Sequence, residues 1–388
     1  MHTHENGREA LAMTTPTSTP AVPRTGIWLI GARGSVATTV VAGCAAVAGG
    51  LQPAIGMVTL TPHFAGSGLP DLGSLVFGGH DVVSCPLPKR AEQLAARGVL
   101  PYDLPQVVRN ELAAADAEIR AGGPVMDDLS QDDELISRFA DDIASFRTRN
   151  NLVRCVVVNV ASTEPAPREG DERLPASSLY AAAALRAGAA YANFTPSTGL
   201  HHPALTGPYD VPVAGRDGKT GQTLLRSVLG PMFAQRALTV RSWSGTNLLG
   251  GGDGAALADP DAAAAKNAGK ARVLADTLGA TPEGVVHIDD VPSMGDWKTA
   301  WDHIAFEGFL GARMVLQTTW QGCDSALAAP LVLDLVRLLA RAHEVGLTGP
   351  LPELGFYFKD PDPRAPASLS EQYVALLGLA EQLRAEHT

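Results

Sequence analysis

Lysine is rare in this chain, and its positions point to chemistry. Twenty-four of the thirty basic residues are arginine. Both side chains serve where only a solvated charge is needed, but lysine loses its proton far more readily when it is desolvated or placed beside another cation. The lysines after residue 200 are therefore candidates for stabilising oxyanions and phosphate and for moving protons, although chance codon usage is the alternative for any single one: Lys219, Lys266, Lys270, Lys298 and Lys359.

Polar, turn-prone runs follow several apolar stretches of the sequence. They are NVASTEP (159–165), NFTPSTG (193–199) and GRDGKTGQT (215–223). Runs of this kind after parallel strands lie at the carboxyl edge of a sheet, where such folds bind ligands. A fourth run, NLLGGGDG (247–254), has three glycines before Asp253, and their amides could bind an anion, or the run could be a plain loop.

The stretch GARGSVATT, residues 31–39, has the spacing of a dinucleotide-binding turn. Gly31 ends a short apolar strand and Gly34 opens a helix, whose N-terminal amides could hold a pyrophosphate. Arg33 stands at the second glycine of the fingerprint, and a simple strand–helix turn is the alternative. The expected second strand, 53–61, ends without the acidic residue that usually holds a ribose hydroxyl, so NAD and NADP are not separated here.

The order of elements predicts the fold class. Apolar runs at 26–30, 53–61, 151–160 and 209–215 alternate with helical patterns at 35–47, 104–121, 132–148, 177–189 and 220–236, which predicts a doubly wound α/β Rossmann-type parallel sheet. Strand-like runs from residue 238, with a helix near 260–278, predict an inserted α+β domain. We expect a leader over 1–25, the Rossmann-type domain over 26–237, the insertion over 238–323, and C-terminal helices over 324–388 that return to the first domain.

Composition excludes several classes of function. The net charge of −11 disfavours nonspecific binding to nucleic acid or to an anionic membrane. No apolar run reaches the roughly 18–20 residues of a membrane span. Residues 1–25 are polar and rich in Thr and Pro, which predicts a disordered leader rather than a signal peptide. The four cysteines are widely spaced, as in a cytoplasmic protein with reduced thiols, and predict no metal site.

The motifs together, in their order along the chain from Gly26 onward, resemble the myo-inositol-1-phosphate synthase family. GARGSVATT stands where that family has its glycine-rich loop, VFGGHDV (76–82) is similar to its glycine–Trp–Asp segment, and NVASTEP is similar to its TANTER stretch. NFTPST, DGKTGQT, TNLLGGGDG, KNAGK, VPSMGDWKTAWD and GCDSALAAPLVLDL each resemble a further family segment.

The resemblance implies an NAD-dependent intramolecular lyase or isomerase that cyclises a hexose 6-phosphate, by default glucose 6-phosphate to myo-inositol 1-phosphate, and that forms a homotetramer through the 240–320 sheet. It implies catalytic roles for Lys219, Lys266, Lys270, Asp296, Lys298 and Lys359. It implies cofactor binding by Gly31, Ala32, Arg33, Gly34, Ser35, Val36, Asp81, Ala161, Ser162, Thr163, Asp217, Asp253 and Asp324. Substrate binding is implied for Asn193, Thr195, Asn247 and Gly250.

The sequence also departs from the family pattern. Ser35 and Val36 replace two asparagines of the cofactor loop, Glu371 stands where the family usually has a lysine, and AHEVGLTG lacks a further family lysine. These losses suggest an altered substrate or ring closure. The main alternative is therefore a fructose 6-phosphate cyclase that forms a five-membered ring in secondary metabolism. An NAD(P)-dependent sugar-phosphate dehydrogenase and a non-catalytic NAD-binding protein are alternatives from other classes.

Overall fold

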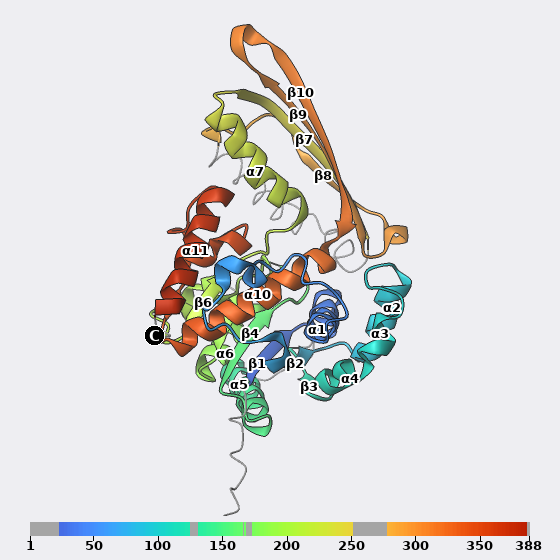
Figure 1. Ribbon diagram of the computed structural model, residues 1–388, viewed down its shortest axis with the longest axis vertical. Helices are drawn as coiled ribbons and strands as arrows, with labels where there is room; N and C mark the ends of the chain where they lie inside the picture. Colours follow the sequence, from blue (N-terminus) through green and yellow to red (C-terminus); the bar gives the residue numbers. More distant parts are fainter. Residues whose placement is uncertain (1–22, 125–130, 166, 168–172, 251–277, 386–388) are drawn as a thin grey trace, which may run out of the picture.

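A seven-stranded parallel sheet forms the base of the molecule (Figure 1). The computed structural model describes residues 23–124, 131–165, 167, 173–250 and 278–385. The strand order is β11-β6-β5-β4-β1-β2-β3, which contains the 3-2-1-4-5-6 order of a dinucleotide-binding fold with β11 added at one edge. The predicted doubly wound α/β class is confirmed. The strands are β1 (Thr25–Ile30), β2 (Leu75–Asp81), β3 (Ile119–Ala121), β4 (Arg154–Asn159), β5 (Ala190–Asn193), β6 (Pro212–Gly215) and β11 (Gly349–Pro350).

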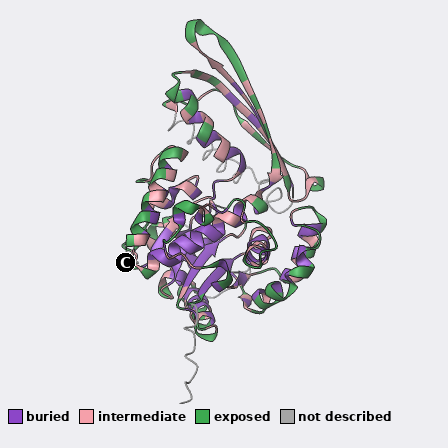
Figure 2. Ribbon diagram, in the orientation of Figure 1, coloured by how far each residue is buried: buried purple, intermediate pink, exposed green. Residues whose placement is uncertain are grey.

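Helices cover both faces of this sheet, which is why its central strands are continuous apolar runs. On one face α1 (Ser35–Ala48) packs against α10 (Asp324–Glu344), and on the other lie α5 (Asp132–Arg149) and α6 (Ala176–Arg186). Figure 2 shows the buried core concentrated in this layer. The remaining helices of this part are α2 (Leu87–Ala96), α3 (Leu104–Val107), α4 (Arg109–Ala117) and α11 (Leu369–Ala385).

The prediction of a second strand over 53–61 is wrong. This segment forms turns and a short 3-10 helix, Val58–Leu60, because the backbone N–H groups of Val58 and Thr59 donate to the carboxylate of Asp334 at 2.7 and 3.2 Å instead of to a neighbouring strand. The strand that pairs with β1 is β2, about twenty residues later. The single helix expected over 104–121 is also wrong, since α3, α4 and β3 share that region.

A four-stranded mixed sheet stands above the parallel one, in the order β10-β9-β7-β8 (Figure 1). Its strands are β7 (Thr239–Leu249), β8 (Val286–Asp290), β9 (Trp297–Glu307) and β10 (Arg313–Cys323). Helix α7 (Gly221–Gln235) packs beneath it and buries Phe233 against Trp243 and Ile304. The sequence predicted that the first domain ends at residue 237, after α7, but α7 packs with the second sheet. The helix expected near 260–278 lies almost wholly outside the described residues.

The first strand begins close to the expected start of the first domain. Strand β1 begins at Thr25, one residue before the expected start, and residues 1–22 of the expected leader lie outside the described residues. Within the described ranges, no helix has both the length and the apolar character needed to cross a membrane. The four cysteines are free, and Cys44, Cys155 and Cys323 are buried.

Candidate active site

A groove of about 440 Å³ runs along the carboxyl edge of the parallel sheet. One side is built by the glycine turn after β1 and by the ends of β2 and β4, as expected from the polar runs at strand ends. The other side is built by the foot of the second sheet. Predicted cofactor residues that line the groove are Gly31, Gly34, Ser35, Val36, Asp81, Ala161, Ser162 and Asp324, together with the predicted substrate residue Gly250 and the predicted catalytic residues Asp296 and Lys298.

The turn after β1 is held in place by its own backbone. Gly31 has φ +80°, and a Cβ at this position would lie 2.7 Å from Cα of Ala161, so a side chain does not fit there. The N–H groups of Gly31 and Ala32 donate to the carbonyl oxygen of His80, at 3.0 and 3.1 Å, and the N–H of Gly34 donates to Gly31. These amides are already paired. The donors left for a pyrophosphate are those of the first turn of α1, where an α-helix lacks internal partners.

An acidic residue does end the second strand of the sheet. Because that strand is Leu75–Asp81 and not 53–61, the residue is Asp81. Its carboxylate accepts the N–H of Arg33 at 2.6 Å and the N–H of Val83 at 2.7 Å, which fixes its position at the groove. The prediction that the second strand ends without an acidic residue is therefore wrong. The position of Asp81 suits a hydrogen bond to a ribose hydroxyl.

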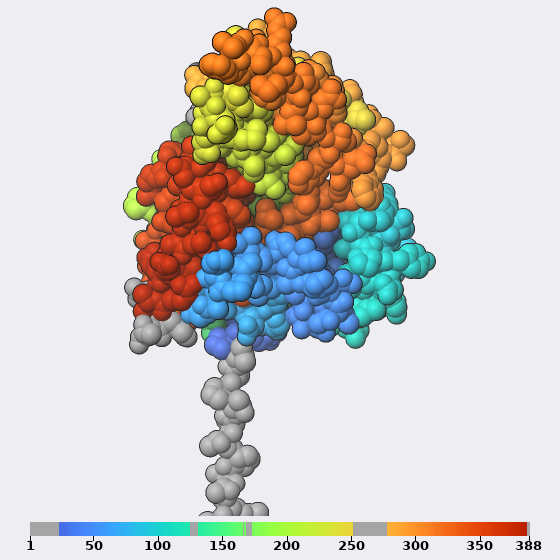
Figure 3. All heavy atoms as spheres, turned by 45° about the horizontal axis from the view of Figure 1, so that its top comes forward, coloured from blue at the N-terminus to red at the C-terminus, as the bar shows by residue number. Residues whose placement is uncertain are grey.

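Asp296 ties the foot of the second sheet to the turn after β1, and its predicted catalytic role stays a prediction. Its Oδ1 accepts the Ser35 hydroxyl at 2.9 Å, and its Oδ2 lies 3.0 Å from the guanidinium of Arg97. The indole N–H of Trp297 donates to the carbonyl of Arg97 at 3.0 Å, and Arg90 donates to the Ser35 hydroxyl at 2.8 Å. Figure 3 shows the region of α2 (cyan) in contact with the foot of the second sheet (orange).

A smaller chamber of about 130 Å³ opens beside the groove. Lys298 lies at the junction, on both linings, and its ammonium is 2.9 Å from Asp324. Across the chamber the ammonium of Lys359 lies 2.8 Å from the carboxylate of Asp217. Two predicted lysines therefore meet in one site, each held by a predicted acidic residue. Thr163, which was predicted to bind the cofactor, and Thr195, which was predicted to bind the substrate, also line this chamber.

Lys219 lies behind this chamber and does not line it. Its side chain is buried, and its ammonium contacts Oε1 of Gln372 and lies 3.4 Å from the carbonyl of Gly355. The side-chain amide of Gln372 donates to Pro366 O at 2.8 Å, which turns Oε1 toward the lysine. Burial lowers the pKa of Lys219 to about 7 because these neutral partners do not compensate for desolvation.

Two predicted substrate residues, Asn193 and Asn247, do not line the groove or the chamber. Asn193 donates to Ser197 O at 2.7 Å and accepts from Thr195 at 2.8 Å, and it lines a separate cavity instead of the chamber. Asn247 is fully buried in β7 and donates to Gln222 at 3.0 Å. The Oδ1 of Asn247 is buried without a hydrogen-bond partner among the described residues. The predicted role of both residues in substrate binding stays a prediction. Asp253, Lys266 and Lys270 lie outside the described residues.

Several residues of the site were not predicted. Arg90 and Arg97 come from α2 and its C-terminus, in a segment without a motif, and only the fold brings them to Ser35 and Asp296. Asp302 is buried in β9, where it accepts from Gln222 at 2.8 Å, from the indole of Trp243 at 2.8 Å and from Arg226 at 3.0 Å. An acid at an inward position of a strand was the available signal. In the described part of the chain, no group of His, Cys, Asp or Glu could hold a metal ion.

Comparison with known proteins agrees with this architecture. The family model of myo-inositol-1-phosphate synthase matches residues 221–325. Inositol-3-phosphate synthase 1 of Bacteroides thetaiotaomicron is 32% identical over 394 residues, which cover 88% of this chain and 90% of that one. The chain belongs to the myo-inositol-1-phosphate synthase family. It is therefore an enzyme of the intramolecular lyase and isomerase type, and its family supports a cyclitol-phosphate synthase.

Other members of the myo-inositol-1-phosphate synthase family are longer or more distant. Inositol-3-phosphate synthase of Trypanosoma brucei brucei is 31% identical over 64% of this chain, which spans 51% of that protein's length. The crystal structure of inositol-3-phosphate synthase from Caenorhabditis elegans superimposes with a TM-score of 0.79, over 93% of this chain and 86% of that one. At 22% identity, this second likeness shows the shared fold alone.

Proposed function

We propose that this enzyme cyclises a hexose 6-phosphate with a bound NAD, and that its default reaction converts glucose 6-phosphate to myo-inositol 1-phosphate. The observation that carries the proposal is the junction at Lys298, where a groove with a dinucleotide-binding turn meets a chamber flanked by a second lysine. A cofactor and a small phosphorylated sugar placed there would meet at one ammonium group. The proposal also rests on family membership.

The residues of the groove fit a dinucleotide. The first-turn amides of α1 suit a pyrophosphate, and Asp81 suits a ribose hydroxyl. The hydroxyl of Ser325, at the start of α10, is buried on the groove wall and has no hydrogen-bond partner among the described residues, so a bound group could satisfy it. NAD would supply oxidation of a substrate hydroxyl and later return of the hydride.

The lysines of the chamber would act on the sugar itself. Oxidation of a ring-carbon hydroxyl to a ketone acidifies the neighbouring C–H, and closure of the carbocycle then requires stabilised negative charge on oxygen. Lys298 and Lys359 present ammonium groups there, each held by a carboxylate that fixes its position. Lys219, buried behind the chamber wall and with a pKa of about 7, would contribute a positive charge near the chamber when it is protonated.

The position of Asp81 supports NAD rather than NADP as the cofactor. A carboxylate at the end of the second strand accepts a hydrogen bond from a free ribose hydroxyl and repels a phosphate on the same oxygen. The nearest guanidinium of the turn, that of Arg33, is 2.9 Å from Asp116 and also donates to the carbonyl of Val83. It is therefore already paired and does not offer a free site for a 2′-phosphate.

A fructose 6-phosphate cyclase that forms a five-membered ring is the second candidate. It is favoured by the position of Glu371, which stands where the family usually has a lysine. Glu371 is exposed at the start of α11 and bonds to Ser368, so it brings no cation to the chamber. A site with fewer cations suits a substrate that develops its negative charge elsewhere.

Product analysis separates these candidates. We would incubate the purified enzyme with NAD at the same concentration as the sugar and, separately, glucose 6-phosphate and fructose 6-phosphate, follow the sugars by NMR and follow NADH by absorbance. Cyclisation without net formation of NADH is the expected result. A six-membered ring formed from glucose 6-phosphate supports the first candidate, and a five-membered ring formed from fructose 6-phosphate supports the second. Stoichiometric NADH would instead indicate a dehydrogenase. An unchanged sugar, with NAD bound, would indicate a non-catalytic protein and contradict the proposal.

We also propose that the enzyme is cytoplasmic and forms a homotetramer through the outer face of the second sheet. The face opposite α7 carries exposed Trp301 and Val315 on neighbouring strands. A second copy would cover this apolar surface, as the family resemblance implies. Light scattering of wild-type protein and of a Val315→Lys variant tests this: a tetramer that the variant does not weaken would contradict the assigned interface.

A further inference from the structure

A cation on the wall of the groove has only neutral partners. Arg90, in α2, lines the groove and is partly buried. Its Nη2 donates to the hydroxyl of Ser35 at 2.8 Å, and its Nη1 donates to the side-chain oxygen of Gln93 at 3.2 Å. No carboxylate of the described residues lies within ion-pair distance of Arg90. Its positive charge is therefore not offset by a described neighbour.

Two other guanidinium groups near the cofactor turn are each paired with a carboxylate. That of Arg33 is 2.9 Å from Asp116, and that of Arg97 is 3.0 Å from Asp296. Neither arginine lines the groove. Arg90 thus differs from both, because it reaches the groove and brings a charge that a ligand can use.

The charges on the groove wall make this cation important for an anionic ligand. Among the described lining residues, the carboxylates of Asp81, Asp296 and Asp324 outnumber the cations of Arg90 and Lys298. Lys298 lies at the junction with the chamber and is 2.9 Å from Asp324. The pyrophosphate of a dinucleotide is anionic, so a nearby cation has to offset its repulsion by these carboxylates.

Arg90 stands beside the helix end that suits a pyrophosphate. Its partner Ser35 is the first residue of α1, whose first turn contains no acidic residue and whose N-terminal amides lack partners within the helix. A guanidinium has more N–H donors than the contacts to Ser35 and Gln93 use. The spare donors and the charge suit a phosphate oxygen, and such charge-assisted hydrogen bonds are stronger than neutral ones.

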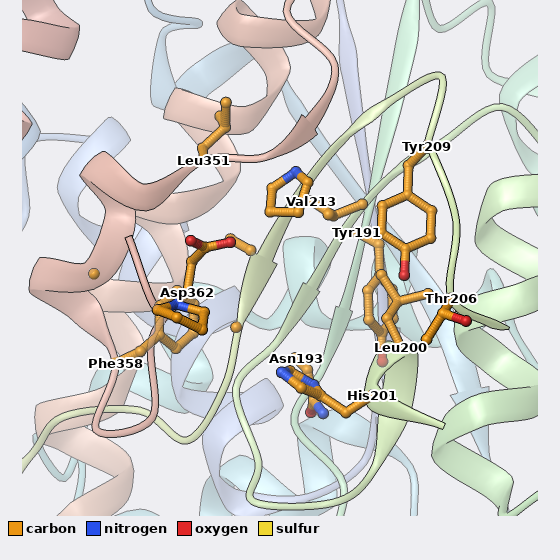
Figure 4. A pocket seen from close by; sticks show the side chains of 15 residues that line it. Tyr191, Asn193, Leu200, His201, Thr206, Tyr209, Val213, Leu351, Phe358 and Asp362 are labelled. Atoms are coloured by element: carbon orange, nitrogen blue, oxygen red, sulfur yellow. The ribbon is translucent and has the colours of Figure 1, made fainter. Parts of the chain in front are cut away.

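A separate cavity of about 290 Å³, at the outer strands β5, β6 and β11, offers no comparable site (Figure 4). None of the described residues that line it is lysine or arginine, and Asp362 places a carboxylate in its wall. Figure 4 shows this carboxylate among aromatic and uncharged side chains such as Tyr191 and Thr206. The groove at Arg90 is therefore the better place for a phosphate.

We propose that Arg90 binds the pyrophosphate of the dinucleotide, with its guanidinium held beside the first turn of α1 by Ser35 and Gln93. We rest this on the proposed function, which places a dinucleotide in the groove. The segment of Arg90 contains none of the sequence motifs, so α2 joins the cofactor site through the fold alone. The contact is made to Ser35, a position where this chain departs from the family pattern.

ADP-ribose is the probe for the pyrophosphate, since it carries that group without the nicotinamide. In calorimetric titrations of the full chain, Arg90→Met should weaken ADP-ribose about tenfold, because a charge-assisted hydrogen bond is lost at a partly exposed site. Arg90→Lys keeps the charge and should recover a large part of that loss. Arg109→Met removes an exposed guanidinium, 3.5 Å from Glu92 of the same helix α2, and should bind ADP-ribose like the wild type.

Two further ligands separate a direct contact from a structural effect and from a different phosphate. Adenosine has no phosphate, so saturation-transfer NMR should show equal binding to wild type and Arg90→Met. A loss of adenosine equal to that of ADP-ribose would indicate a structural role and overturn the proposal. NAD and NADP should be weakened by the same factor in Arg90→Met. A larger loss for NADP would place Arg90 at a ribose phosphate and also overturn it.

Failure of this role and failure of the proposed function give different results. Wild-type protein that binds neither NAD nor ADP-ribose would contradict the proposed function. If the wild type binds both, equal ADP-ribose affinity of Arg90→Met and Arg109→Met would overturn the role of Arg90 alone. Thermal unfolding of each variant verifies that the compared proteins are folded.

Discussion

The ammonium of Lys298 lies 2.9 Å from Asp324, the first residue of α10. The carboxylate stands at a helix N-terminus, where negative charge is favoured, and it fixes the lysine at the junction of groove and chamber. Both side chains are partly exposed to those spaces, at 18% and 33%. The pair is thus accessible to a ligand as well as ordered.

Replacing Lys298 should remove catalysis and leave binding of the cofactor nearly intact. Lys298→Ala should lower turnover by at least about a hundredfold, because one oriented electrostatic or acid–base group is lost. Lys298→Arg should also be poor, since guanidinium is bulkier and keeps its proton. Steady-state kinetics, with NAD affinity and thermal unfolding as controls, check this. Full activity of the Ala variant would remove Lys298 from the site.

The pKa of Lys219 should depend on Gln372. Gln372→Glu places a carboxylate beside the amine and should raise its pKa from about 7, whereas Glu371→Gln, on the exposed neighbour, should not change it. NMR of labelled lysine side chains measures this directly, because the chain has only six lysines. An unchanged pKa in Gln372→Glu would contradict the assigned contact.

The lowered pKa of Lys219 should make its contribution to the free energy of unfolding rise with pH. The folded-state pKa of Lys219 is depressed below the ordinary value of 10.5, so between about pH 7 and pH 10.5 the unfolded chain binds a proton that the folded chain does not. The contribution of this group to the free energy of unfolding therefore increases with pH across that window. Urea titrations should show that the free energy of unfolding increases less with pH in Gln372→Glu than in wild type. The same increase in both proteins would contradict the role of Lys219.

A carboxylate in the cofactor turn should abolish NAD binding. In Gly34→Asp the new Cβ would lie 3.1 Å from Gly31 O and the charge would face the expected pyrophosphate. Gly43→Asp adds the same charge to the same helix at a position with nothing within 4 Å, so it should bind NAD normally. Calorimetric titration with NAD is the measurement. Intact binding by Gly34→Asp would show that the cofactor turn is wrongly assigned.

Asp81 should determine the choice between cofactors. Asp81→Ser removes the charge that opposes a 2′-phosphate and keeps a short polar side chain, so NADP affinity should rise relative to NAD by roughly tenfold, which corresponds to about 1.4 kcal/mol. Dissociation constants for both dinucleotides give the ratio. A ratio that does not change would place the adenosine ribose elsewhere in the groove.

The second sheet should depend on the buried Asp302–Arg226 pair, whose side chains are 1% and 2% exposed. Asp302→Leu leaves Arg226 buried without its partner and should cost about 3–5 kcal/mol. Adding Arg226→Met should recover a large part of that loss, because the pair is then replaced by apolar groups. Urea denaturation of the single and double variants checks this; a double variant no better than the single would contradict it.

Much of the fold could be predicted because its signals are local. The glycine turn, the apolar run of β4 and the helix after Gly221 are written in consecutive residues. The segment 53–61 failed because its partner is distant: Asp334 binds its amides across 275 residues of sequence, and no local pattern reveals that contact. The same error hid the position of Asp81 at the end of the second strand, although the family resemblance had named the residue. Side-chain direction was the other obstacle, since the side chains of Asn193 and Asn247 bond to neighbouring residues and do not line the groove or the chamber.

The second sheet and α7 are one excursion of the chain, and its entry and exit nearly touch. A Cβ at Gly221, where the excursion starts, would lie 3.5 Å from the carboxylate of Asp324, where it ends. If the excursion rotated as a rigid body about these adjoining ends, each atom would be displaced in proportion to its distance from them. The ammonium of Lys298 lies very close to this point, because it is bonded to Asp324. The tip of the β9–β10 hairpin at Phe309 lies far from it (Figure 1). A rotation that swings the tip would therefore leave the lysine in register with the groove.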